Sequence, residues 1–190
     1  MKSLVFNNYG KKLSTQPVCL YIYRVHKKNL LYLIMYNTLL FIHSWLRWII
    51  LVMAVVVIFK SLTGWLGKKG YTKGDNALSA SFVGFMHLQL LLGLILYFVS
   101  PYAFKAIKSM GMSGVMSSPV NRFWAVEHIF IMIIAIVLAQ VGRSRAKRMS
   151  DAVRKHKTSF IFFTISIVLI LVSILTLYMK VNPGLSWFRM

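Results

Sequence analysis

Four histidines of this chain are spaced so that each one falls in, or at the entry of, a different apolar segment. They are His43, His87, His128 and His156. A lipid bilayer is a costly place for an imidazole unless the side chain has a hydrogen-bond partner or binds a metal. One histidine per apolar segment therefore predicts a bound group or a polar network inside a bundle of helices.

The composition indicates what kind of bundle this is. The 190 residues are 58% hydrophobic and 14% charged, whereas soluble domains are about 45–50% apolar and about 25% charged. Four segments, over about residues 39–59, 77–99, 120–141 and 158–179, reach the length of about 20 residues that a helix needs to cross hydrocarbon. We therefore expect an all-α, polytopic membrane protein, a four-helix transmembrane up-down bundle.

The N-terminal segment carries charges that do not suit a fifth span. Basic residues would lie near the middle of the stretch Pro17–Asn37, which also lacks the order of a signal peptide. We expect native translation to start at Met35, so that residues 1–34 are upstream sequence or a disordered extension. Residues 35–182 then form the transmembrane domain and residues 183–190 a C-terminal tail.

The net charge of +20 bears on topology and on partners. The basic residues lie mainly in loops and tails beside the apolar segments, where they contact anionic membrane lipid. No nucleic-acid-binding motif accompanies them, so we do not expect nucleic acid as a partner. The loops between the first and second segments and between the third and fourth are the most basic. The positive-inside rule places both in the cytoplasm of a multi-pass protein of the bacterial inner membrane.

Helical periodicity and depth bring two of the histidines together. His128 falls on a stripe of small or polar side chains, which face other helices or a bound group more often than lipid. Arg47 lies four residues after His43 and shares its face. Both histidines lie about 9–15 Å inside the outer ends of their helices, at 1.5 Å per residue. The stripe that contains His128 is made of Asn121, Ala125, His128, Met132, Ala135, Ala139 and Gly142.

This geometry predicts a haem. The first and third helices of an up-down bundle lie diagonally, farther apart than the 8–10 Å of adjacent helices. A flat macrocycle with an imidazole on each side of its iron needs such a gap. We predict one haem b with His43 and His128 as axial iron ligands.

The other two histidines lie at different depths. Counted from the helix starts, His87 lies about 9 Å deeper than His156, so a second haem between them requires one of the two helices to shift. The alternative for His156 is a position at the basic surface. His87 lies at the edge of a small-residue face for which we expect close helix packing; it could line the porphyrin, bind a quinone or pass a proton. That face contains Ala77, Ser81 and Gly84.

Arg47 has to be neutralised inside a membrane. Its candidate partners are Glu127 and an anionic ligand group such as a haem propionate, and both stay open.

Other metal sites and catalytic motifs are not indicated. Zinc or copper needs three or four converging ligands, which the pair of histidines lacks, and the single Cys19 excludes a cysteine-ligated cluster. No phosphate loop, nucleophile elbow or paired carboxylates are present, so we assign no catalytic residue. Helix packing accounts for the seven-residue spacing of Ser159, Ser166 and Ser173.

Four longer motifs cover most of residues 35–179. They are MYNTLLFIHSWLRWIILV (Met35–Val52), FMHLQLLLGLILYF (Phe85–Phe98), NRFWAVEHIFIMIIAIVLA (Asn121–Ala139) and RKHKTSFIFF (Arg154–Phe163). In these motifs the chain resembles the small four-helix membrane proteins of Bacteroidetes-type bacteria labelled cytochrome B. It is more distantly similar to the membrane protoporphyrinogen oxidase family, a resemblance that implies haem binding through the first and third helices and oxidation of a haem precursor.

Three functions follow as hypotheses. The first is a b-type cytochrome that transfers electrons between a quinone or a partner redox protein and an acceptor. The second is an enzyme, a haem-dependent membrane oxidoreductase resembling protoporphyrinogen oxidase. The third is a non-redox transporter or assembly subunit in which the histidines, Glu127 and Arg47 form a proton relay.

Overall fold

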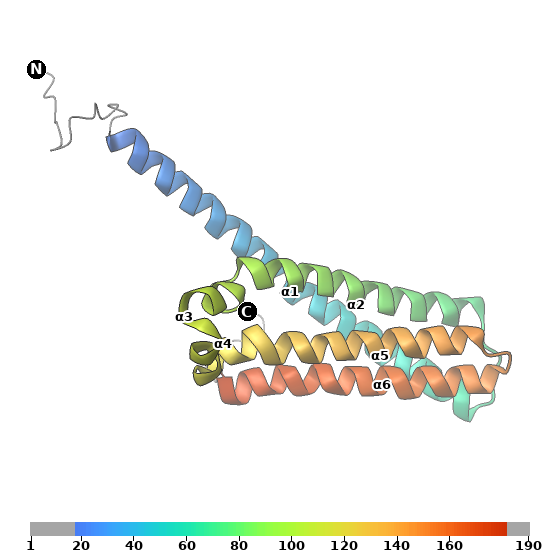
Figure 1. Cartoon of the computed structure of the whole chain (residues 1–190). Coiled ribbons are helices and arrows are strands. Elements are labelled where there is room, and N and C mark those ends of the chain that lie inside the picture. Colours follow the sequence, from blue (N-terminus) through green and yellow to red (C-terminus); the bar gives the residue numbers. More distant parts are fainter. Residues whose placement is uncertain (1–17, 182–190) are drawn as a thin grey trace, which may run out of the picture. The chain divides into compact units, whose positions relative to one another are not determined.

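The computed structural model describes residues 18–181, and these are helical almost throughout (Figure 1). Four helices are long and apolar enough to cross a membrane, with candidate spans at Leu30–Leu66, Lys73–Val99, Pro119–Arg148 and Ala152–Met179. The expected all-α class and the four spans are confirmed, and they support a multi-pass membrane protein. The elements are α1 (Val18–Leu66), α2 (Lys73–Val99), α3 (Phe104–Ser117), α4 (Pro119–Arg122), η1 (Phe123–Glu127), α5 (His128–Arg148), α6 (Ala152–Thr176) and η2 (Leu177–Val181).

The chain divides into two compact units, residues 1–37 and residues 38–190. Residues 18–34 are helical, so the expectation of disorder is not met there. The physical reason is that no proline or glycine occurs between Pro17 and Gly64. The expected start at Met35 stays a prediction. The expected C-terminal tail and the first 17 residues of the N-terminal extension lie outside the described residues.

Two of the long helices begin earlier than their apolar segments because their first turns are polar and capped. The Thr72 side chain accepts the backbone N–H of Asp75 at 3.2 Å, and the Asp75 carboxylate accepts that of Thr72 at 2.9 Å, a capping box that starts α2. At α6 the Asp151 carboxylate accepts the backbone N–H groups of Val153 and Arg154. Hydropathy alone places these starts several residues too late.

The third apolar segment is preceded by a helix that the sequence did not predict. This helix, α3, contains a kink at Gly111, whose φ of 70° is open to glycine at little cost. Ser118 then caps α4 and Pro119 occupies its first turn. One π-helical turn, η1, follows and ends directly before His128. Such wide turns occur often at functional sites, because they re-aim the side chains on either side.

The core lies where the four long helices meet. Leu46 and Ile50 of α1, Met86 of α2, Ala139 of α5 and Phe163 of α6 are among its buried residues. α5 packs against both α2 and α6, while α1 meets the same two helices through its own contacts described below. α1 and α5 are therefore placed as the diagonal pair of an up-down bundle. Large apolar side chains exposed on the four long helices suit contact with lipid.

The expected serine repeat is a packing feature of α6. Ser159, Ser166 and Ser173 are each fully buried, and the Ser166 hydroxyl donates a hydrogen bond to the backbone oxygen of Ala135 in α5 at 2.6 Å. Small hydroxyl side chains let two helices approach closely and link them across the interface. The prediction of packing is confirmed here.

The small-residue face of α2 behaves differently. Ala77, Ser81 and Gly84 are exposed, and a Cβ added at Gly84 would meet nothing within 4 Å. The expectation that this face packs closely inside the bundle is therefore wrong for the contacts within the described chain. The buried face of α2 is instead the one that carries Ser79, Phe82 and Met86.

Candidate functional site

His128 is the first residue of α5, and its ring is held from several sides. Its Nδ1 lies 3.2 Å from the Ser173 hydroxyl oxygen of α6. The rings of Phe123 and Trp124 lie 5.6 Å and 5.3 Å from the imidazole, centroid to centroid. Hydrogen bonding through Nδ1 fixes the ring orientation and leaves Nε2 as the nitrogen suited to bind a metal or a ligand.

His43 of α1 lies against α2. Its backbone oxygen accepts a hydrogen bond from the Gln89 side chain at 2.9 Å. A Cβ added at Gly93 would lie 3.3 Å from the imidazole Cε1, so the absence of a side chain there lets the ring approach α2 closely. The His43 Nδ1 is buried and has no hydrogen-bond partner among the described residues. A buried nitrogen usually has a hydrogen-bond partner or a bound ligand.

The two histidines and Arg47 lie near enough to interact electrostatically. The expected shared face of His43 and Arg47 is present, since Arg47 is only 8% exposed and Ile50 and Ala54 below it are buried. The small-residue stripe of α5 is buried too, at Ala125, Ala135, Ala139 and Gly142. The fold thus brings His43, Arg47 and His128 into one polar group within an apolar bundle.

Arg47 has a partner that sequence reasoning did not find. Its guanidinium hydrogen-bonds with the side chain of Tyr178 in η2, and it lies 5.6 Å from the centroid of the Trp48 ring. A tyrosine at the end of an apolar segment is usually an interfacial anchor, so its sequence position gave no sign of this contact. Next to the pair is a pocket of about 90 Å³ lined by Arg47, Trp48, Leu51, Leu171, Ile174 and Tyr178.

Glu127 is not the partner of Arg47. The Glu127 carboxylate accepts a hydrogen bond from the Arg122 side chain at 2.8 Å, so the ion pair between Arg47 and Glu127 considered from the sequence is wrong. The other two acidic residues of the chain are engaged in the same way. Asp75 pairs with Lys60 at 3.0 Å, and Asp151 pairs with Arg154 at 3.6 Å.

The metal-binding side chains near His43 and His128 limit which metal or cofactor the site could bind. Within residues 18–181, no three His, Cys, Asp or Glu side chains gather as a metal-binding group. Two imidazoles alone satisfy the axial positions of a haem iron, because the macrocycle supplies the other four ligands. Comparisons with protein-family models, with curated proteins and with solved structures give no match.

His87 does not join this group. Its side chain is exposed on α2, and its Nδ1–H donates to the backbone oxygen of Val83 in the same helix at 2.8 Å. His156, by contrast, is only 3% exposed and packs against other elements. The positions of these two side chains do not support a second haem between them.

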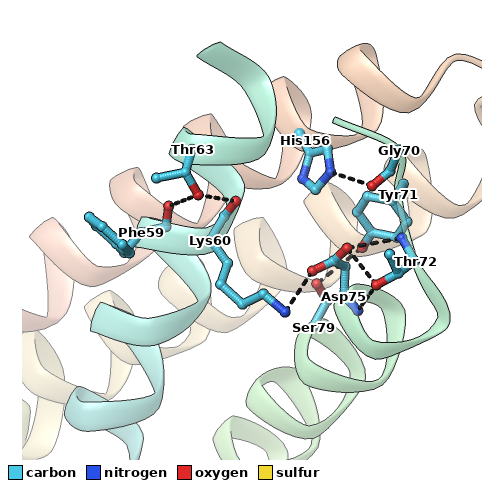
Figure 2. Close-up of polar contacts among 9 residues, drawn as sticks. All are labelled: Phe59, Lys60, Thr63, Gly70, Tyr71, Thr72, Asp75, Ser79 and His156. Atoms are coloured by element: carbon cyan, nitrogen blue, oxygen red, sulfur yellow. Dashed lines mark hydrogen bonds and ion pairs between the residues drawn. The ribbon is translucent and has the colours of Figure 1, made fainter. Parts of the chain in front are cut away.

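His156 belongs to a second polar group, shown in Figure 2. Its Nε2 lies 3.5 Å from the backbone oxygen of Gly70, and its ring lies 4.9 Å from that of Tyr71. A Cβ added at Gly64 would come within 2.5 Å of the imidazole, so this ring fills the space that glycine leaves on α1. The expectation of a surface histidine is therefore wrong, because the loop between α1 and α2 covers it.

Further polar contacts extend this second group toward α2 (Figure 2). The Tyr71 hydroxyl lies 3.2 Å from that of Ser79, and Asp75 joins Lys60 to the first turn of α2. Lys155 lies over the Tyr71 ring at 5.5 Å, a cation–π contact between α6 and the loop. These contacts connect α1, α2 and α6, so we assign this group a structural role.

Proposed function

We propose that the chain is a b-type cytochrome of the bacterial inner membrane, in which His43 and His128 are the axial ligands of one haem b. The observation that carries the proposal is that the two imidazoles, on α1 and α5, lie near enough to each other and to Arg47 to interact electrostatically. Two imidazoles from separate helices can bind a haem iron from its two sides.

The side chains around the histidines suit such a group. The orphaned Nδ1 of His43 is the kind of buried polar atom that coordination or a hydrogen bond would satisfy. The contact between His128 and Ser173 is the support that a ligand imidazole usually receives from a neighbouring residue. Gly93 lets the His43 imidazole pack closely against α2, which limits the positions of the ring.

When bound, haem supplies reversible one-electron chemistry. The residues of the chain would orient it and set its potential, because burial in an apolar bundle, the charge of Arg47 and the hydrogen bond to His128 all act on the iron. Electrons would come from and go to a membrane quinone or a partner redox protein. The resemblance to the cytochrome B proteins agrees with this role.

The orientation of the bundle in the membrane follows from the distribution of its basic residues. The loops at Gly67–Thr72 and Met149–Asp151, together with the helix ends beside them, are rich in basic residues, among them Lys68, Lys69 and Arg148. The positive-inside rule puts this end of the bundle in the cytoplasm. The haem ligands then lie nearer the opposite surface, since His43 and His128 belong to the other halves of their spans.

A reduced-minus-oxidised absorption spectrum of the purified full-length protein tests the proposal. We expect the bands of a low-spin haem with two histidine ligands, and their loss in His43→Ala and in His128→Ala. His87→Ala is the matched control, because this histidine is exposed and bonds only within its own helix. An unchanged ratio of haem to protein in His43→Ala or in His128→Ala would contradict the ligand assignment.

A further inference from the structure

The connection between the second and third spans contains the kinked helix α3. The spans Lys73–Val99 and Pro119–Arg148 lie on either side of it in the sequence, and α3 packs against α2, α4 and η1 at the end of the bundle where these elements meet (Figure 1). With 14 residues, α3 is shorter than the roughly 20 that a membrane span needs. Because both spans reach the membrane surface at this end of the bundle, α3 lies at that surface.

The two halves of α3 have the same arrangement of faces. Ala106 in the first half and Val115 in the second are buried. At about 100° per residue, Lys108 lies opposite Ala106. By the same geometry Ser113 and Ser117 lie opposite Val115, and all three of these polar residues are exposed. Each half therefore has an apolar line toward the protein and a polar line away from it.

Methionines occupy the flank between these two lines. Met112 and Met116 are one helical turn apart, and the two residues are 53% and 46% exposed. An apolar flank beside a polar line is typical of helices that lie in a membrane interface. Thioether side chains are flexible and apolar, so they adapt to acyl chains as well as to a protein core.

Packing within the chain fixes the rotation of α3. Ala106 and Val115 form a small buried cluster with Ala125, so the helix is held against η1. The positive φ of Gly111 lets the chain bend between the two halves, and both buried residues reach the cluster. The methionine flank therefore cannot turn into the bundle.

We propose that α3 is an interfacial helix whose partner is the lipid of one leaflet, with Met112 and Met116 against the acyl chains and the polar line in water. The positive-inside rule makes this the outer leaflet, because the most basic loops are at the other end of the bundle. Helices of this kind bury their apolar side about 5–10 Å into the boundary between headgroups and acyl chains. The inference rests on the packing and the faces of α3 and is independent of haem binding.

Spin-label accessibility in the full-length protein tests the proposal. A Cys19→Ser background removes the single cysteine of the chain, and a nitroxide is then attached at Met112→Cys or at Met116→Cys. The protein is reconstituted in vesicles of phosphatidylcholine and phosphatidylglycerol, where oxygen concentrates among the acyl chains and a nickel chelate stays in water. We expect the ratio of collision rates, oxygen to nickel chelate, to be several-fold higher at these two positions than at Ser113→Cys and Ser117→Cys. These two serines are matched controls, since they lie in the same half of α3 and are also exposed.

All four labelled positions are exposed, so the substitutions leave the buried cluster of α3 intact. Labels at Met112→Cys and Met116→Cys that collide freely with the nickel chelate would place the flank in water and overturn the proposal. Labels there that neither reagent reaches would also overturn it, because protein, such as a second copy of the chain, would then cover the flank. Equal ratios at all four positions would do the same, since α3 would have no lipid-facing side.

Discussion

The Nδ1 of His128 lies 3.2 Å from the Ser173 hydroxyl oxygen, a contact that joins the first turn of α5 to the last turns of α6. The Ser166 hydroxyl makes a further polar link between these helices along the buried serine repeat, to the backbone oxygen of Ala135. The repeat therefore packs two helices together and also orients one imidazole.

Ser173→Ala should weaken haem binding without abolishing it. The imidazole of His128 would lose the group that fixes its orientation, and loss of such a support typically costs about 10- to 100-fold in affinity for the bound metal group. The measurement is the haem dissociation constant by titration of the apoprotein. Ser159→Ala is the matched control, since this serine is equally buried and its hydroxyl has no hydrogen-bond partner among the described residues. Equal effects of the two substitutions would contradict the assigned role of Ser173.

Gly64→Ala should destabilise the bundle. The new Cβ would lie 2.5 Å from the His156 imidazole, and overpacking of this kind costs about 1–3 kcal/mol. The measurement is thermal unfolding in detergent. Combining Gly64→Ala with His156→Ala should recover part of the loss, because the two side chains compete for one space. Gly84→Ala, where nothing lies within 4 Å of the added atom, should change the unfolding temperature little; a loss as large as that of Gly64→Ala would refute the packing argument.

Asp75→Ala should lower the free energy of unfolding by about 1–2 kcal/mol, because it removes one half of the capping box of α2 and the partner of Lys60. Asp151→Asn is a suitable comparison at α6, since asparagine caps helices about as well as aspartate, and we expect it to have little effect. Denaturant unfolding followed by circular dichroism measures both. A neutral Asp75→Ala would show that the cap and the ion pair contribute nothing net.

Glu127→Gln should leave haem binding unchanged and cost at most about 1 kcal/mol of stability. The reason is that Glu127 pairs with Arg122, with both side chains more than a third exposed, and such pairs are worth about 0–1 kcal/mol. The checks are the haem content of the purified variant and its unfolding curve. Loss of haem in Glu127→Gln would instead support a role for this carboxylate beside Arg47.

Some of the site could be predicted because helical periodicity is a local property. The shared face of His43 and Arg47 and the buried stripe of α5 follow from 100° per residue, whatever the neighbouring helices are. The seven-residue serine spacing likewise predicted a packing face. These features hold in the structure because no glycine or proline interrupts the helices between the residues concerned.

Other predictions failed where a residue depends on a loop or on a distant segment. His156 looked like a surface residue because its neighbours Lys155 and Lys157 are basic, yet the loop at Gly67–Thr72 folds over it. Tyr178 and Arg47 are far apart in the sequence, and no local pattern connects them. The choice of Arg122 as the partner of Glu127 depends on the turns of α4 and η1, whose π-helical form the sequence did not indicate.

By itself, the sequence determined the all-α class, the four membrane-length helices and the faces on which His43, Arg47 and His128 lie, because hydropathy and helical geometry act between residues a few positions apart. Only the tertiary structure decided which histidines meet. It buried His156 under a loop, left His87 exposed, and placed Tyr178 beside Arg47. These outcomes depend on how the helices pack and where their connections run, which involves contacts between residues distant in the chain.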